Sequence, residues 1–352
     1  MSGKTARAKL HDLIDQGAHN WSDPEYKPLL SPARTAAWKF CVRNYGFRYT
    51  KRLGAPGTEY PPVPLIQGAL WHAMAAAEDQ GYHIPTALAE AAVDIRNGPT
   101  YRIEWSPTID YLVQEMQGKW LRDYRAATRL DPMHHDIISV EKTYVAEWDK
   151  FIMLTIPDKV IRVLSDSSIW IVERKSTSRD DSGWHNKWPG NPQTTAEVVV
   201  VEKALGEPVA GVYIEPVVVT RKRNQTWDFP YPQPINNFTI YPWRAIDKTP
   251  IIRQAWLDYV NDVVDDMRSR DGNPDRLWAP NLVNCELCDY QPYCNGRKQL
   301  HDPLDGLIPL SEDRIGKLLS RERIAAGLSP TLLSRLAAQG ALALKDIPDP
   351  AK

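Results

Sequence analysis

The stretch that decides the fold is residues 136–174, which read DIISVEKTYVAEWDKFIMLTIPDKVIRVLSDSSIWIVER. Short runs of β-branched and aromatic residues alternate in it with the polar sequences WDK and SDSS. Such runs fit a pleated, partly buried surface, and the polar clusters between them mark turns. The stretch therefore predicts three successive β-strands.

The segments on either side read mainly as helices. Ser31 is a favourable N-cap residue followed by Pro32, so a helix is expected over residues 31–53. Apolar spacing and stop signals predict further helices at 65–81, across most of 88–131, at 193–206 and at 249–270, and further strands within 209–223 and 236–243. This order predicts an α/β (α+β) fold with a central mixed β-sheet flanked by helices.

The composition is typical of an ordinary globular protein. The 352 residues include 43 Lys plus Arg and 44 Asp plus Glu, for a net charge of −1, and 43% are hydrophobic. A disordered or fibrous chain is excluded, and a nucleic-acid partner would need a local basic patch. There is no uncharged apolar run of about 18 residues, and the N-terminal sequence lacks the apolar centre of a signal peptide. We therefore expect a cytoplasmic protein without membrane association.

Two carboxylates and a lysine stand at adjacent strand ends in the predicted sheet. Pro157-Asp158 precedes one strand, and Glu173-Arg174-Lys175 lies in the next. Glu173 and Lys175 share one face of their strand because side chains alternate with period two. Two carboxylates and a backbone carbonyl suit Mg²⁺ or Mn²⁺, and a lysine can orient a metal-bound water. The alternative is a solvated strand with charged outward positions.

These letters resemble the signature of the PD-(D/E)xK nuclease superfamily. Two further residues, His72 in a predicted helix after Gly68 and Gln193 at the start of another, resemble its RecB-like branch. This sequence departs from that branch at three positions, which are Pro157, Lys159 and Glu197, the last standing where the branch has tyrosine. Taken alone, His72 could equally be a packed or surface histidine.

The resemblance implies a restriction-endonuclease-like core and a divalent metal site. In that site Asp158, Glu173, His72 and the backbone carbonyl of Arg174 would hold Mg²⁺ or Mn²⁺. Lys175 and Gln193 would complete the catalytic set with the two carboxylates. The departure at Glu197 weakens the expectation that its helix contacts DNA.

The four cysteines fall into a lone Cys41 and the cluster Cys285, Cys288 and Cys294. One N-terminal cysteine followed by a late C-x2-C-x5-C resembles the iron–sulfur nucleases of the RecB-like group, which include CRISPR-associated nucleases. The resemblance implies that all four thiolates bind a [4Fe–4S] cluster, which would tie the N-terminal helix to the C-terminal segment. A zinc site with the same thiolates and inert buried thiols are the alternatives.

Positive charge gathers near the N-terminus in a segment without acidic residues. Between residues 34 and 52 lie the candidate DNA-binding residues Arg34, Lys39, Arg43, Arg48, Lys51 and Arg52, interleaved with aromatic side chains. Basic groups can follow a phosphate backbone, and aromatic rings can stack on unpaired bases. Alternatively, the aromatic rings belong to the core and the charges are merely solvated. A second, weaker candidate is Arg221-Lys222-Arg223.

These features predict a metal-dependent DNA exonuclease acting on single-stranded or end-containing DNA in recombination, repair or CRISPR-related processing, in a bacterium or in a virus-infected cell. The expected parts are an N-terminal extension (1–30), a nuclease domain (31–297) and a helical C-terminal tail (298–352). The nuclease domain would contain a helical insertion at about 82–135 and the cluster-binding segment 278–297. A recombinase, helicase or single-strand-binding protein would be its protein partner. The alternatives are a catalytically dispensable DNA-binding or assembly module for such a partner, and a zinc-stapled structural protein.

Overall fold

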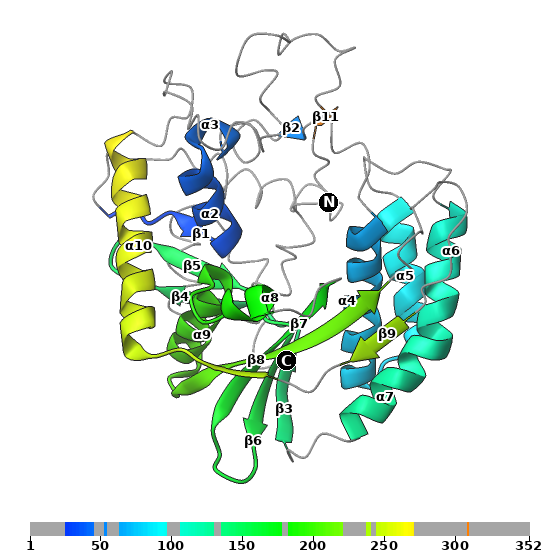
Figure 1. Cartoon of the computed structure of the whole chain (residues 1–352). Coiled ribbons are helices and arrows are strands. Elements are labelled where there is room, and N and C mark those ends of the chain that lie inside the picture. Colours follow the sequence, from blue (N-terminus) through cyan, green and yellow to red (C-terminus); the bar gives the residue numbers. More distant parts are fainter. Residues whose placement is uncertain are drawn as a thin grey trace, which may run out of the picture.

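A mixed six-stranded β-sheet forms the centre of the protein (Figure 1). The computed structural model describes residues 25–45, 53–54, 63–96, 106–129, 135–177, 182–220, 237–240, 244–270 and 308–309. The sheet has the strand order β10-β8-β7-β6-β3, with β9 also paired to β8. Its strands are β3 (His135–Val140), β6 (Lys159–Val163), β7 (Ile169–Thr177), β8 (Val209–Thr220), β9 (Asn237–Ile240) and β10 (Arg244–Asp247). Strands β7 and β8 run parallel and the other pairs are antiparallel, which confirms the predicted mixed sheet.

A smaller sheet has the order β1-β5-β4, formed by β1 (Leu29–Leu30), β5 (Ile152–Thr155) and β4 (Tyr144–Glu147). Residues 136–174 thus contribute to five strands, and the prediction of three was wrong. The two turns that were missed lie around Glu141, which adopts a φ of 49°, and between Thr155 and Lys159. Strands β4 and β5 are buried almost throughout, so their sequences lack the alternation that separates neighbouring strands. A further two-residue pair joins β2 (Leu53–Gly54) to β11 (Ile308–Pro309).

Helices α9 (Pro192–Leu205) and α10 (Pro250–Ser269) build the core on one face of the sheets. Asn191 caps α9, and Gly206 ends it in the left-handed conformation at a φ of 71°. The Val-rich face of α9 is buried against β4, β5 and β8, as expected for a buried helix. Helix α10 packs on α9 and on α2 (Pro32–Phe40), and Figure 1 shows α10 and α2 side by side.

The N-terminal helix is shorter than predicted. Helix α2 ends at Phe40, Cys41 is extended, and a four-residue helix α3 (Val42–Tyr45) follows. The indole of Trp38 is buried in the core and donates to Asp266 Oδ2 of α10 at 2.7 Å. The extended φ and ψ of Cys41 break the helix that a continuous helix-forming sequence had suggested.

A second helical group covers the opposite face of the large sheet. It consists of α4 (Val63–Gln80), α5 (Ile84–Arg96), α6 (Ser106–Glu115), the π-helical turn η4 (Met116–Trp120) and α7 (Leu121–Arg129). These helices share their own core, in which Trp71 packs edge-on against Tyr124. Gly81 ends α4 at a φ of 65°, as predicted. A short helix, α8 (Ser182–Asn186), precedes α9. Within the described residues, no helix is both long and apolar enough to span a membrane.

Candidate active site

Asp158 and Glu173 meet at one end of the central sheet. Asp158 lies in the bend before β6, and β6 pairs antiparallel with β7 so that Lys159 stands opposite Val172. The backbone N–H of Arg174 donates to Asp158 Oδ2 at 2.6 Å and fixes that carboxylate. Asp158 and Glu173 are only 6% and 3% exposed. Two nearly buried carboxylates so close together need cationic partners.

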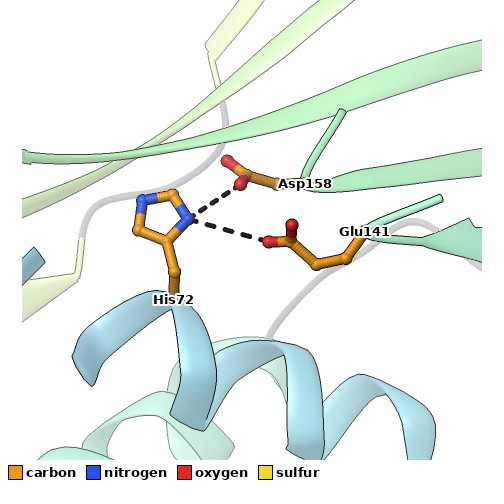
Figure 2. Close-up of side chains that lie close together, drawn as sticks. All are labelled: His72, Glu141 and Asp158. Carbon is orange, nitrogen blue, oxygen red and sulfur yellow. Dashed lines mark hydrogen bonds and ion pairs between the residues drawn. The ribbon is translucent and has the colours of Figure 1, made fainter. Parts of the chain in front are cut away.

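His72 and Glu141 approach the other oxygen of Asp158 (Figure 2). His72 Nδ1 of α4 lies 2.8 Å from Asp158 Oδ1 and 3.9 Å from Glu141 Oε1. One ligand atom from each of these residues lies within 4.8 Å of the others, so the three can hold a metal ion together. An imidazole nitrogen with two carboxylate oxygens suits a cation such as Mn²⁺.

Glu141 was not among the site residues predicted from the sequence. Its backbone N–H donates to the carbonyl of Asp158 at 3.1 Å, because β3 and β6 pair with Val140 opposite Lys159. The only signal in the sequence was an acidic residue directly after an apolar strand. Which residue that strand would place beside Asp158 depends on the register between the two strands.

Glu173 is held from the side of α9. Lys175 forms an ion pair with Glu173 Oε1, and Gln193 Nε2 donates to the same oxygen at 2.9 Å. Gln193 also donates to Glu197 Oε1 at 2.9 Å. Glu173, Lys175 and Gln193 therefore lie together at this end of the sheet. Glu197, which stands in place of the family tyrosine, is a buried neighbour of this group.

The carboxyl groups of Asp158 and Glu173 differ in their pKa values. Burial tends to raise the pKa of Asp158, but the imidazole of His72 and the guanidinium of Arg174 outweigh it and lower the pKa to about 2. Burial and the charge of Asp158 raise the pKa of Glu173 to about 7, despite the opposing effect of Lys175. Burial and the charge of Glu173 likewise raise the pKa of the Glu197 carboxyl well above its ordinary value. At neutral pH Asp158 is therefore the permanently ionised member of the group.

A buried ionic network holds strand β7 on the face opposite to Glu173. The side chain of Arg174 pairs with Asp79 of α4, and its Nε donates to Glu215 Oε2 of β8 at 3.0 Å. Lys159 Nζ lies 3.3 Å from Asp79 Oδ1. Asp79 follows His72 by seven residues, roughly two helical turns, so both project from one face of α4 onto the sheet. The network thus positions α4 and brings His72 to Asp158.

The other predicted site residues are only partly described. Arg34 Nη1 donates to the carbonyl of Leu29 at 3.2 Å, and the exposed Lys39 lies 5.8 Å from the ring centre of Tyr259. Cys41 is a buried free thiol. Arg43 lies in α3, with no side-chain placement described. Outside the described residues lie Arg48, Lys51, Arg52, Arg221, Lys222, Arg223, Cys285, Cys288 and Cys294.

Comparison with known proteins supplies a family. The family model of the PD-(D/E)XK nuclease superfamily matches residues 29–295. Among solved structures, the chain is similar to a proposed exonuclease from Eubacterium rectale, with 14% identity and a TM-score of 0.45, over 85% of this chain and 95% of that one. It is also similar to the protein SSO0001, with 11% identity and a TM-score of 0.31, over 84% of this chain and 98% of that one. The search of curated proteins found no significant match.

Proposed function

The chain belongs to the PD-(D/E)XK nuclease superfamily, and on that premise we propose that it is a metal-dependent DNA exonuclease of the RecB-like branch. The observation that carries the proposal is the arrangement around Asp158. One of its oxygens faces His72 and Glu141, and the other accepts the backbone N–H of Arg174 beside Glu173. A candidate metal-ligand group and a lysine therefore share one sheet end, a combination that can promote phosphodiester hydrolysis.

The donor set fits a divalent cation. We assign His72, Asp158, Glu173 and the carbonyl of Arg174 as its ligands, as the resemblance to the family implies. Glu141 is an additional ligand, because its carboxylate groups with His72 and Asp158 in the structure. When bound, Mg²⁺ or Mn²⁺ would lower the pKa of a water ligand and offset negative charge on the phosphoryl group. The Asp158 carboxyl, whose pKa lies well below its ordinary value, would be ionised and ready to hold such a cation at neutral pH.

The remaining residues would position the reactants. Lys175, which reaches Glu173 from the same strand face, would orient the attacking water and stabilise charge on a phosphoryl oxygen. Gln193 would hold Glu173 through its amide. Arg174 would act through its backbone, because its side chain is held on the opposite face by Asp79 and Glu215.

We propose the same division of the chain as the sequence suggested. Residues 31–297 form the nuclease domain, and α5 to α7 form its helical insertion at about 82–135. Residues 1–30 are an extension whose last two residues form β1 of the smaller sheet, and 298–352 are a C-terminal tail. The basic segment that includes Arg34 and Lys39 would contact DNA along its phosphates rather than by stacking of Trp38, since that indole is in the core.

We propose that Cys41, Cys285, Cys288 and Cys294 bind a [4Fe–4S] cluster, with zinc as the alternative metal. The support is the cysteine pattern together with the position of Cys41, a free thiol at the break between α2 and α3. Protein purified without oxygen should be brown and contain about four iron atoms per chain. A colourless, zinc-rich preparation would contradict the cluster.

The activity is tested with two forms of single-stranded DNA. In Mn²⁺ the protein should shorten an end-labelled linear strand progressively and leave a circular strand of the same sequence intact, because an exonuclease needs an end. Addition of EDTA should stop the reaction. Cleavage of the circle would show an endonuclease instead. If neither strand is cut although the protein binds DNA, the chain is the non-catalytic assembly module for a recombinase or helicase.

A further inference from the structure

Lys187 is held at a fixed position in the turn between α8 and α9. Its Nζ lies 4.5 Å from the ring centre of Trp188 and 5.2 Å from that of Trp184. The two indoles pack edge to face with their centres 5.3 Å apart, and both are buried. Two aromatic faces attract one ammonium group and restrict its movement. Lys187 is nevertheless an exposed residue, so its charge is both positioned and accessible.

The same turn is fastened beside the active site. The buried Lys248 donates from Nζ to the carbonyls of Trp188 and Pro189 at 2.7 and 2.8 Å. Asn191 then caps α9, accepting from the backbone N–H of Thr194 at 3.1 Å. Two residues further on, Gln193 reaches Glu173. A short, well-fastened segment therefore connects Lys187 to the catalytic group.

The charge of Lys187 has no anionic partner among the described residues, where its interactions are with the two tryptophan rings. Desolvation and then the ammonium of Lys175 lower the pKa of Lys187. Lys187 precedes by six residues the Gln193 that shares Glu173 Oε1 with Lys175. An anion bound beside these two ammonium groups would neutralise their positive charge.

We propose that Lys187 is a DNA-binding residue that contacts a backbone phosphate next to the cleaved bond, with Trp184 and Trp188 holding its ammonium in place. The proposal rests on the DNA nuclease function proposed above and adds the residue that places the strand against Lys175. A phosphate diester is the anion that this substrate brings to the site. Because the contact involves no base, it serves any DNA sequence.

The test is binding of a labelled single-stranded oligonucleotide in EDTA, where no hydrolysis occurs. The variant K187Q should bind roughly tenfold more weakly than the wild type, the usual order for loss of a charged hydrogen bond. The slope of log K against log salt concentration should fall by about 0.7 for one lost phosphate contact. In Mn²⁺ the KM should rise with kcat little changed, and K187R should restore most of the affinity.

The matched control is K203Q. Lys203 lies over the ring of Trp148 at 4.8 Å, but on α9 ten residues after Gln193, roughly 15 Å along the helix. K203Q loses the same kind of ring contact and should bind like the wild type. A K187Q protein with the DNA affinity and salt slope of the wild type would overturn the proposal. Equal losses of DNA affinity in K187Q and K187R would overturn it as well. A wild-type protein that neither binds nor cleaves DNA would overturn the proposed function as well.

Discussion

Replacing Lys175 by Gln is expected to slow DNA hydrolysis about 10³-fold at saturating Mn²⁺. The ammonium of Lys175 lies on the same strand face as Glu173 and pairs with its carboxylate at the sheet end where Asp158 lies. It is therefore the side chain placed to orient a water and to stabilise charge on a phosphoryl oxygen. Glutamine keeps most of the length and removes the charge. The rate is measured in single turnover on an end-labelled strand.

A simpler role for Lys175 is to keep Glu173 ionised, and the same variant distinguishes the two. Burial and Asp158 already raise the pKa of Glu173 to about 7, and loss of Lys175 would raise it further. A carboxyl group is ionised above its pKa. If Lys175 serves only to keep Glu173 ionised, K175Q assayed at pH 9 with excess Mn²⁺ should therefore recover the wild-type rate. We expect instead that the Mn²⁺ affinity of K175Q recovers at pH 9 while its rate of hydrolysis stays low, because Lys175 also acts on the water and the phosphoryl group. Full recovery of the rate would show that Lys175 acts only through Glu173.

The parts of the fold and site that could be predicted depend on short separations in the sequence. Asp158 directly precedes β6, and Glu173 and Lys175 lie on the neighbouring β7 after a short turn, so alternation and antiparallel pairing place the three together. The helix 193–206 carries its own start and stop signals in Asn191, Pro192 and Gly206, and the structure confirms it within one residue at each end. Side-chain alternation and capping residues therefore suffice to predict contacts between residues that are close together in the sequence.

Contacts between distant segments could not be predicted. In the sequence Asp79 is an ordinary acidic residue near the end of an Ala-rich helix, and its role depends on Arg174 of β7, which lies 95 residues later. The core position of Trp38 depends likewise on α10, whose Asp266 lies 228 residues away. The aromatic and basic pattern of residues 34–52 does not say which side chains face the core. Only the packing of α2 on α10 decides that the Trp38 indole is internal.

Glu141 is a candidate active-site residue that no sequence motif marks. Its side chain reaches the site because the chain leaves β3 at a φ of 49°, and because Val140 rather than a neighbour stands opposite Lys159. A one-residue change in register would turn the side chains of β3 to the other face. The letters around Glu141 specify neither the register nor the turn, so the residue carries no recognisable signature.

We expect the variant E141Q to bind Mn²⁺ on the order of 10–100-fold more weakly than the wild type, the range found for groups that support a protein metal site. Glutamine keeps the size and one carbonyl oxygen, but it removes the negative charge that faces His72 at 3.9 Å. The affinity is measured by calorimetry or by the paramagnetic resonance of free Mn²⁺, without DNA, so that the result does not depend on catalysis. At limiting Mn²⁺ the exonuclease rate should fall in parallel, and excess Mn²⁺ should restore much of it.

The matched control for E141Q is E207Q. Glu207 is also a turn residue in an ion pair, with Arg162 at 2.9 Å, but it lies on the protein surface. Surface pairs of this kind contribute little to stability, so E207Q should keep wild-type Mn²⁺ affinity. If E141Q also keeps that affinity, Glu141 is merely an ionic neighbour of His72, and the cation is held by Asp158, Glu173 and His72 without it. A loss confined to E141Q would show that Glu141 is part of the cation site, placed there by strand register and lying outside the residues of the family signature.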